Sequence, residues 1–103
     1  MHIVVFSTAS NKKEAERISK ALLTSKLVAC VNIIHNIKSI FWWQGRLDQA
    51  GECLLVIKSR KKNLDKIIRL IKDKHSYDVP EIIALPIIGG NKDYLNWIDE
   101  SVR

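Results

Sequence analysis

The longest pattern of strand-forming residues in this chain covers residues 27–59. Two apolar and β-branched runs meet there at Gln44 and Gly45, and glycine supplies the positive φ that a two-residue hairpin turn requires. The pattern predicts a β-hairpin in which Trp43 pairs with Arg46. Its first strand would span roughly 50 Å, whereas a compact domain of this length is about 30 to 35 Å across. We therefore expect the hairpin to extend beyond its own domain or to bend sharply.

The end of this hairpin carries four consecutive large apolar residues: Ile40, Phe41, Trp42 and Trp43. Successive residues of a strand point to opposite faces, so both faces of the ribbon are apolar and neither has a second layer to cover it. An isolated two-stranded ribbon is also marginally stable in water. These four residues are therefore predicted to form an interface with another copy of the chain. The alternative is that the two tryptophans stack on a ligand or a base.

The rest of the chain alternates between strand and helix patterns. Residues 2–8 form an apolar run typical of a central strand, and Asn11 with Glu14 matches a capping box at the start of a helix that ends near Ser25. Gly51 suggests a β-bulge in the second hairpin strand. Three further elements are expected: a helix over residues 63–75 with an i, i+3, i+4, i+7 apolar stripe, a strand over residues 81–88, and a short helix that begins after residue 91.

This βαββαβ order predicts an α+β fold: a ferredoxin-like antiparallel sheet with both main helices on one face, a long β-hairpin and an extra C-terminal helix. We expect one domain over residues 1–103. The last strand should be an edge strand, which accommodates Pro86 because proline cannot donate to a ladder. The uncovered sheet face is a second reason to expect an oligomer. The end of the first strand, the hairpin turn and the loop after the second helix should lie at one end of the sheet, where a site built from loops is expected.

Composition narrows the functional classes. The formal net charge is +6, but the lysines and arginines are spread along two helices and interleaved with acidic residues, which is typical of solvated helix faces and makes nucleic-acid binding an unfavoured interpretation. No apolar run reaches the roughly 20 residues that cross a bilayer, so no membrane partner is expected and the sequence is interpreted as cytoplasmic. In the predicted hairpin Cys30 faces Ser59 and Cys53 faces Asn36, about 20 Å apart, so no disulfide is expected.

The sequence offers little support for catalysis. It has no Ser/His/Asp arrangement of recognisable spacing, no glycine-rich phosphate loop and no paired carboxylates in an expected cleft. A basic ferredoxin-like module that binds RNA is the alternative function. That alternative requires exposed aromatic side chains on the two central strands, and those strands are aliphatic instead.

Six segments in the same order resemble the CutA family of divalent cation tolerance proteins. They are residues 7–9, 27–32, 39–45, Glu52 with residues 57–59, residues 75–82, and residues 94–98. The resemblance covers nearly the whole chain. It implies a ferredoxin-like subunit in a tight homotrimer, similar in architecture to the PII signalling proteins, with the long hairpin reaching across to a neighbour. It also implies a non-enzymatic protein linked to tolerance of divalent metals, copper especially, with a PII-like signalling protein as an alternative.

The resemblance also bears on a metal site. Some family members bind metal through a cysteine before the Thr-Ala pair and two consecutive histidines before the tyrosine, and the corresponding residues here are Ser7, Lys74 and His75. His75 is thus the metal ligand that the resemblance implies, with Cu(II) as the cation. A hydroxyl and an ammonium are poor replacements for thiolate and imidazole. Cys30 and His35 cannot chelate together, because five residues apart in a strand they point to opposite faces.

A ligand-binding cleft between subunits is the remaining candidate site. Its expected residues are Ser7, His75, Tyr77, Glu81 and Lys58. The alternatives are structural: His75 would favour the C-terminal end of a helix dipole, Tyr77 would shape a turn, and Lys58 would be a solvated strand end.

Overall fold

The computed structural model describes residues 1–103. The elements, in chain order, are β1 (His2–Ala9), α1 (Lys12–Thr24), β2 (Cys30–Trp43), β3 (Arg46–Arg60), a short 3-10 helix η1 (Lys61–Asn63), α2 (Leu64–Lys74), β4 (Ile82–Pro86) and α3 (Lys92–Ser101). No helix is long and apolar enough to cross a membrane.

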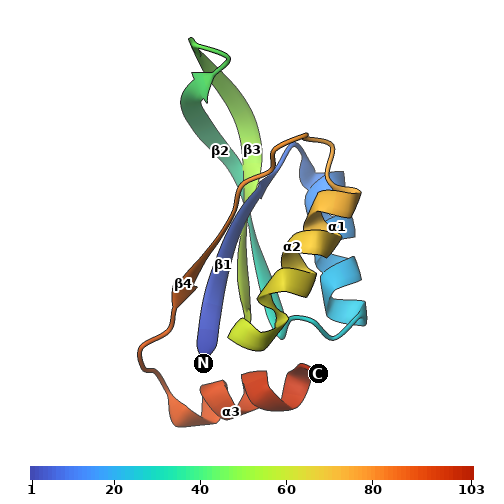
Figure 1. Cartoon of the computed structure of the whole chain (residues 1–103), viewed down its shortest axis with the longest axis vertical. Coiled ribbons are helices and arrows are strands. Elements are labelled where there is room, and N and C mark those ends of the chain that lie inside the picture. The colour runs from blue at the N-terminus through green and yellow to red at the C-terminus, as the bar shows by residue number, and fades with distance from the viewer.

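The four strands form one antiparallel sheet in the order β2-β3-β1-β4. α1 and α2 lie side by side on one face of this sheet, and α3 lies across its lower end (Figure 1). The α+β, ferredoxin-like prediction is confirmed, including the central places of β1 and β3. β4 pairs only with β1, so Pro86 lies in an edge strand as expected.

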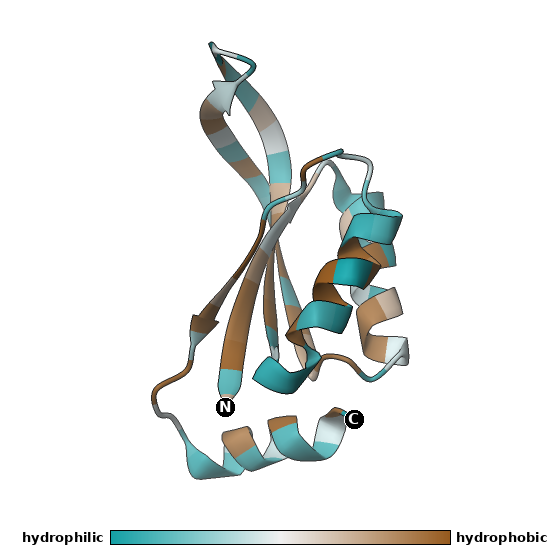
Figure 2. Cartoon of the chain, in the orientation of Figure 1, coloured by the Kyte–Doolittle hydropathy of each residue, from teal (hydrophilic) through white to brown (hydrophobic).

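The hydrophobic core fills the space between the sheet and its two helices. In β1 and β3 alternate side chains point toward the helices, so Val5, Leu55 and Ile57 are completely buried. The helices contribute Ile18 and Ile67 from their apolar stripes. The exposed sides of both helices are largely polar, whereas β1 and β4 are apolar along most of their length (Figure 2). Helix packing on one side of the sheet therefore leaves apolar side chains on the other side.

That other side, which we call the open sheet face, has no second layer over most of its area within the chain. Its residues include Val4 and Leu54 on the central strands, with Ile83 and Leu85 on β4. Ile83 is 53% exposed and Leu85 is 44% exposed. α3 is tied to the lower end of the sheet through Asp99, which accepts from His2 at 2.9 Å and pairs with Arg60 at 3.3 Å.

The hairpin projects from the end of the sheet opposite α3 (Figure 1). It turns at Gln44 and Gly45, and Trp43 pairs with Arg46 as predicted. The longest dimension of the chain is 44 Å and its radius of gyration is 14.1 Å, above the roughly 13 Å of a compact domain of this size. The predicted overhang is confirmed. Its four apolar residues, Ile40, Phe41, Trp42 and Trp43, are between 37% and 72% exposed.

The predicted position of the β-bulge is wrong. Gly51 pairs regularly with Lys38, and the register shift lies instead in β2 between Ile34 and Ile37. Asn36 takes the positive φ of 61° there, a conformation that asparagine tolerates better than most residues. The bulge moves the partner of Cys30 from the expected Ser59 to Lys58. Both cysteines are free thiols.

Candidate functional site

A network of buried hydrogen bonds joins the end of β1, the start of α1 and the loop after α2. Asn11 caps α1 by accepting from the Glu14 N–H at 2.9 Å, as the capping pattern predicts. The Glu14 carboxylate does not accept from the Asn11 N–H, as a full capping box would require. One of its oxygens accepts from the Ser10 N–H at 3.0 Å and the other from the Ser76 N–H at 2.8 Å. Glu14 therefore ties the 75–81 loop to the first helix.

The environment of Glu14 favours its charged form. Burial alone would raise the pKa of this carboxyl, but the hydrogen bonds from Ser10 and Ser76 outweigh burial and lower the pKa to about 2. Arg17 lies 3.7 Å away on the next turn of the helix. Glu14 is thus a buried anion held by three donors, which are the N–H and the hydroxyl of Ser10 and the N–H of Ser76.

His75 is the next residue of this network, and both of its ring nitrogens make hydrogen bonds. Its Nε2 donates to the Thr8 carbonyl oxygen at 2.7 Å, and its Nδ1 accepts from the Tyr77 N–H at 3.0 Å. The side chain is completely buried. This pattern requires the neutral tautomer with the proton on Nε2. A metal ion at His75 would have to displace one of these two hydrogen bonds.

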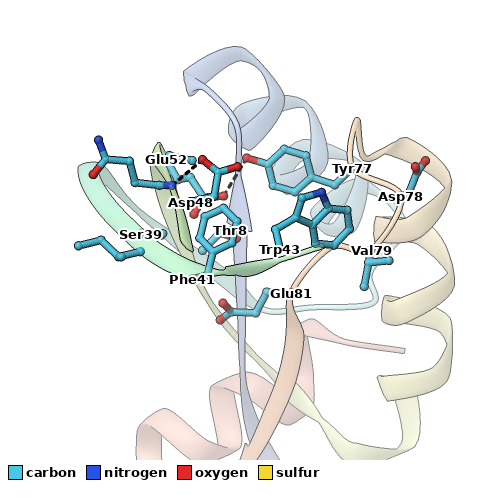
Figure 3. A pocket seen from close by; sticks show the side chains of 13 residues that line it. Thr8, Ser39, Phe41, Trp43, Asp48, Glu52, Tyr77, Asp78, Val79 and Glu81 are labelled. Atoms are coloured by element: carbon cyan, nitrogen blue, oxygen red, sulfur yellow. Dashed lines mark hydrogen bonds between the residues drawn. The ribbon is translucent and has the colours of Figure 1, made fainter. Parts of the chain in front are cut away.

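Tyr77 leads from this network into a cavity of about 660 Å³ between the hairpin and the 75–81 loop. Its hydroxyl donates to Glu52 Oε2 at 2.8 Å (Figure 3). The other lining residues include the aromatic Phe41 and Trp43. The acidic members of the lining are Asp48, Glu52, Asp78 and Glu81. The cavity has the size of a small-molecule site.

We expect Tyr77 to ionise late. Burial raises the pKa of its hydroxyl, the hydrogen bond to Glu52 raises it further, and the value reaches about 12 instead of 10.0. Because the folded pKa is raised, the associated stability is present below pH 10 and is lost as the pH rises from 10 to 12. In a Tyr94→Phe variant Tyr77 is the only tyrosine, and its tyrosinate absorbance should have a midpoint near 12. The same variant in denaturant is the control, and a folded midpoint near 10 would contradict the Glu52 contact.

The structure brings together some of the predicted cleft residues and separates others. Tyr77 and Glu81 line the cavity, and His75 lies directly behind Tyr77, with ring centroids 4.7 Å apart. The placement of Ser7 in the cleft is wrong: its side chain is completely buried on the helix side of β1, and the neighbouring Thr8 lines the cavity instead. The alternation of strand side chains separates these two neighbours.

Lys58 does not line the cavity of its own chain. Lys58 pairs with Val4 on β1, four residues before Thr8, a distance of roughly 13 Å along the strand. Its ammonium donates to the Asn32 amide oxygen on the open sheet face. Lys58 therefore contacts its own hairpin partner strand and not the cavity.

Sequence reasoning missed the cavity residues Thr8 and Asp48 and the anchoring role of Glu14. The capping pattern identified Glu14 but placed it on a helix surface. Nothing local indicates its bond to Ser76, which lies 62 residues away.

The side chains do not form the metal site that the resemblance implied. No group of three or more histidine, cysteine, aspartate or glutamate residues is placed to hold a metal ion. Both nitrogens of His75 are already bonded, and Ser7 is completely buried. The prediction of His75 as a ligand for Cu(II) therefore does not fit the residues present in one chain.

Taken together, these features define a class: a ferredoxin-like α+β protein with a projecting apolar hairpin and a loop-lined, acidic and aromatic cavity at the hairpin base. Residues 3–101 match the family described as the CutA1 divalent ion tolerance protein. The chain belongs to this CutA family, as its motifs predicted. The family name refers to tolerance of divalent cations and specifies no reaction.

Individual relatives agree with this assignment. The chain is 46% identical to the divalent-cation tolerance protein CutA of Archaeoglobus fulgidus over 100% of both sequences. It is also 46% identical to the chloroplastic protein CutA 1 of rice, covering 98% of this chain but only 57% of that protein. Among solved structures, CutA1 of Thermus thermophilus superposes with a TM-score of 0.98 at 41% identity over 100% of both chains.

The interpretation of the sequence as cytoplasmic is wrong. The solved relative from Archaeoglobus fulgidus, with a TM-score of 0.97 and 46% identity, is described as a periplasmic protein, and the rice relative is described as chloroplastic. Relatives with this fold are described from different compartments, so the fold does not indicate a location.

Proposed function

We propose that this chain assembles as a homotrimer that contributes to divalent-cation tolerance without catalysing a reaction. In this assembly the cavity beside Tyr77 lies at a boundary between subunits and holds a cation or a small ligand. The observation that carries the proposal is the unpartnered apolar surface, which consists of the open sheet face and the projecting hairpin. The family name supports the link to divalent cations.

The apolar surface supports assembly on energetic grounds. Trp42 is 72% exposed, Leu47 is 66% exposed and Ile40 is 68% exposed, all within one short stretch of hairpin. Burying one such side chain contributes about 1.5 to 3 kcal/mol. Monomeric proteins rarely expose a contiguous apolar surface of this kind. Copies of the same chain can cover both the hairpin and the open sheet face through a closed, symmetric arrangement.

The character of the cavity supports a ligand role over catalysis. Its carboxylates are oxygen donors, which suit hard cations better than copper. His75 is saturated by hydrogen bonds and is therefore not available there as a general base. The RNA-binding alternative gains no support, because Phe6 is the one phenylalanine, tyrosine or tryptophan on the open faces of β1 and β3.

Sedimentation equilibrium tests the proposal directly. At micromolar concentration we expect a single species with three times the 11.8 kDa mass of the chain, because the apolar surface has to be buried. Calorimetric titration of this species with divalent cations then tests the cavity, with a Glu81→Gln variant expected to weaken any binding that occurs there. A monomer at this concentration would overturn the proposal.

A further inference from the structure

The β-bulge in the hairpin creates a pair of side chains that the predicted register had separated. His35 and Asn36 both lie opposite Cys53, because the register shifts between Ile34 and Ile37. The His35 ring comes to rest against the thiol, with 3.4 Å between Nδ1 and Sγ. The unshifted register would have placed Asn36 opposite Cys53. The bulge therefore converts an asparagine–cysteine pairing into a histidine–cysteine pairing.

The two partners differ in burial in a way that suits a binding site. Cys53 is 3% exposed and belongs to the hydrophobic core, so its sulfur has a fixed position. His35 is exposed and makes no other side-chain hydrogen bond. One donor is thus held by packing, while the other is reachable from solvent and free to adjust.

The separation of the two atoms matches a shared metal ion. Metal–thiolate and metal–imidazole bonds are about 2.3 and 2.0 Å long, and at a tetrahedral angle their ends are about 3.5 Å apart. The observed 3.4 Å agrees with this value. A linear arrangement of the same two bonds requires about 4.3 Å, which a small outward rotation of the exposed His35 ring supplies.

We propose that Cys53 and His35 form a binding site for a thiophilic metal ion, Zn(II) or Cu(I). Thiolate and imidazole are the donors that these ions select, in contrast to the oxygen donors around the cavity. On binding, the Cys53 thiol loses its proton to solvent, the sulfur bonds to the metal, and the neutral His35 ring supplies the second bond without any change in oxidation state. Water or an added ligand completes the coordination of Zn(II), whereas two donors suffice for Cu(I).

This site would supply two metal ligands for the proposed tolerance role. Its biological meaning rests on that role, but the binding itself does not. It is separate from His75 and from the cavity carboxylates. Both donors belong to one chain, so binding requires no residue from a second copy. A failure of the binding test and a failure of the sedimentation test can therefore be told apart.

The experiment is a competition titration of the reduced full chain. Zn(II) and, under anaerobic reducing conditions, Cu(I) are added separately in the presence of a chromogenic chelator, and ultraviolet absorbance monitors formation of the metal–thiolate bond. The variants are His35→Ala, which changes an exposed side chain, and Cys53→Ala, with circular dichroism as a check on folding. Cys30→Ala is the matched control, because Cys30 is the other free thiol of the same hairpin.

We expect one ion per chain for at least one of the two metals. His35→Ala should lower the affinity at least about tenfold, Cys53→Ala should abolish the thiolate absorbance, and Cys30→Ala should leave both unchanged. Equal affinity of the wild-type and His35→Ala chains for both metals would overturn the proposal. Loss of binding in Cys30→Ala alone would overturn it as well.

Discussion

Replacing Leu85 with aspartate is expected to convert the proposed trimer into a monomer. Leu85 is 44% exposed on the open sheet face at the edge strand, so the substitution costs the isolated chain little. In an assembly that covers this face, each chain would bury an unpaired carboxylate, at a cost of several kcal/mol per site. Sedimentation equilibrium should therefore show the mass of a single chain, with the far-ultraviolet circular dichroism of the wild-type fold.

Leu23→Asp is the matched control for this experiment. Leu23 is 39% exposed on α1, on the other side of the sheet, so it introduces the same charge at a similar exposure away from the open face. The control variant should keep the mass of the wild-type assembly. If Leu85→Asp and Leu23→Asp behave alike, the open sheet face is not where the subunits meet.

The topology was predictable because each of its signals is local. The helix stripes, the Gln44–Gly45 turn and the proline in the edge strand each act within a few residues, and together they leave few possible arrangements. The register was predictable only as far as the bulge. Gly51 and Asn36 can both serve an irregular position, and the sequence does not say which one takes it.

The candidate site was less predictable because its determinants are not local. Residues 3–6 are all apolar and Ser7 and Thr8 are both polar, so the strand does not alternate, and nothing indicated that Thr8 and not Ser7 would face the cavity. Similarly, an exposed histidine and a buried cysteine 18 residues apart become neighbours only after the bulge has shifted the strand. Side-chain contacts across the fold depend on such shifts, which the pattern of hydrophobic residues does not record.

Glu14→Gln is expected to destabilise the folded chain by about 2 to 3 kcal/mol. The carboxylate accepts bonds on both oxygens, from Ser10 and from Ser76. A glutamine places an NH₂ group against one of these donors, which leaves a buried N–H without an acceptor. Glu16→Gln is the control: Glu16 lies on the exposed side of the same helix, and surface substitutions usually stay within about 0.5 kcal/mol.

The pH dependence of unfolding gives the same prediction a second measurement. Because the folded pKa of Glu14 is lowered to about 2 from an ordinary value of 4.5, its contribution to stability is present above pH 4.5 and is lost as the pH falls toward 2. This contribution is about 3 kcal/mol. Denaturant unfolding at fixed protein concentration should therefore show a steeper acid loss of stability in the wild-type chain than in Glu14→Gln. Parallel pH profiles for the two proteins would mean that the carboxylate does not anchor the 75–81 loop, and the cavity wall formed by Tyr77 would then lack the support that the Ser76 bond provides.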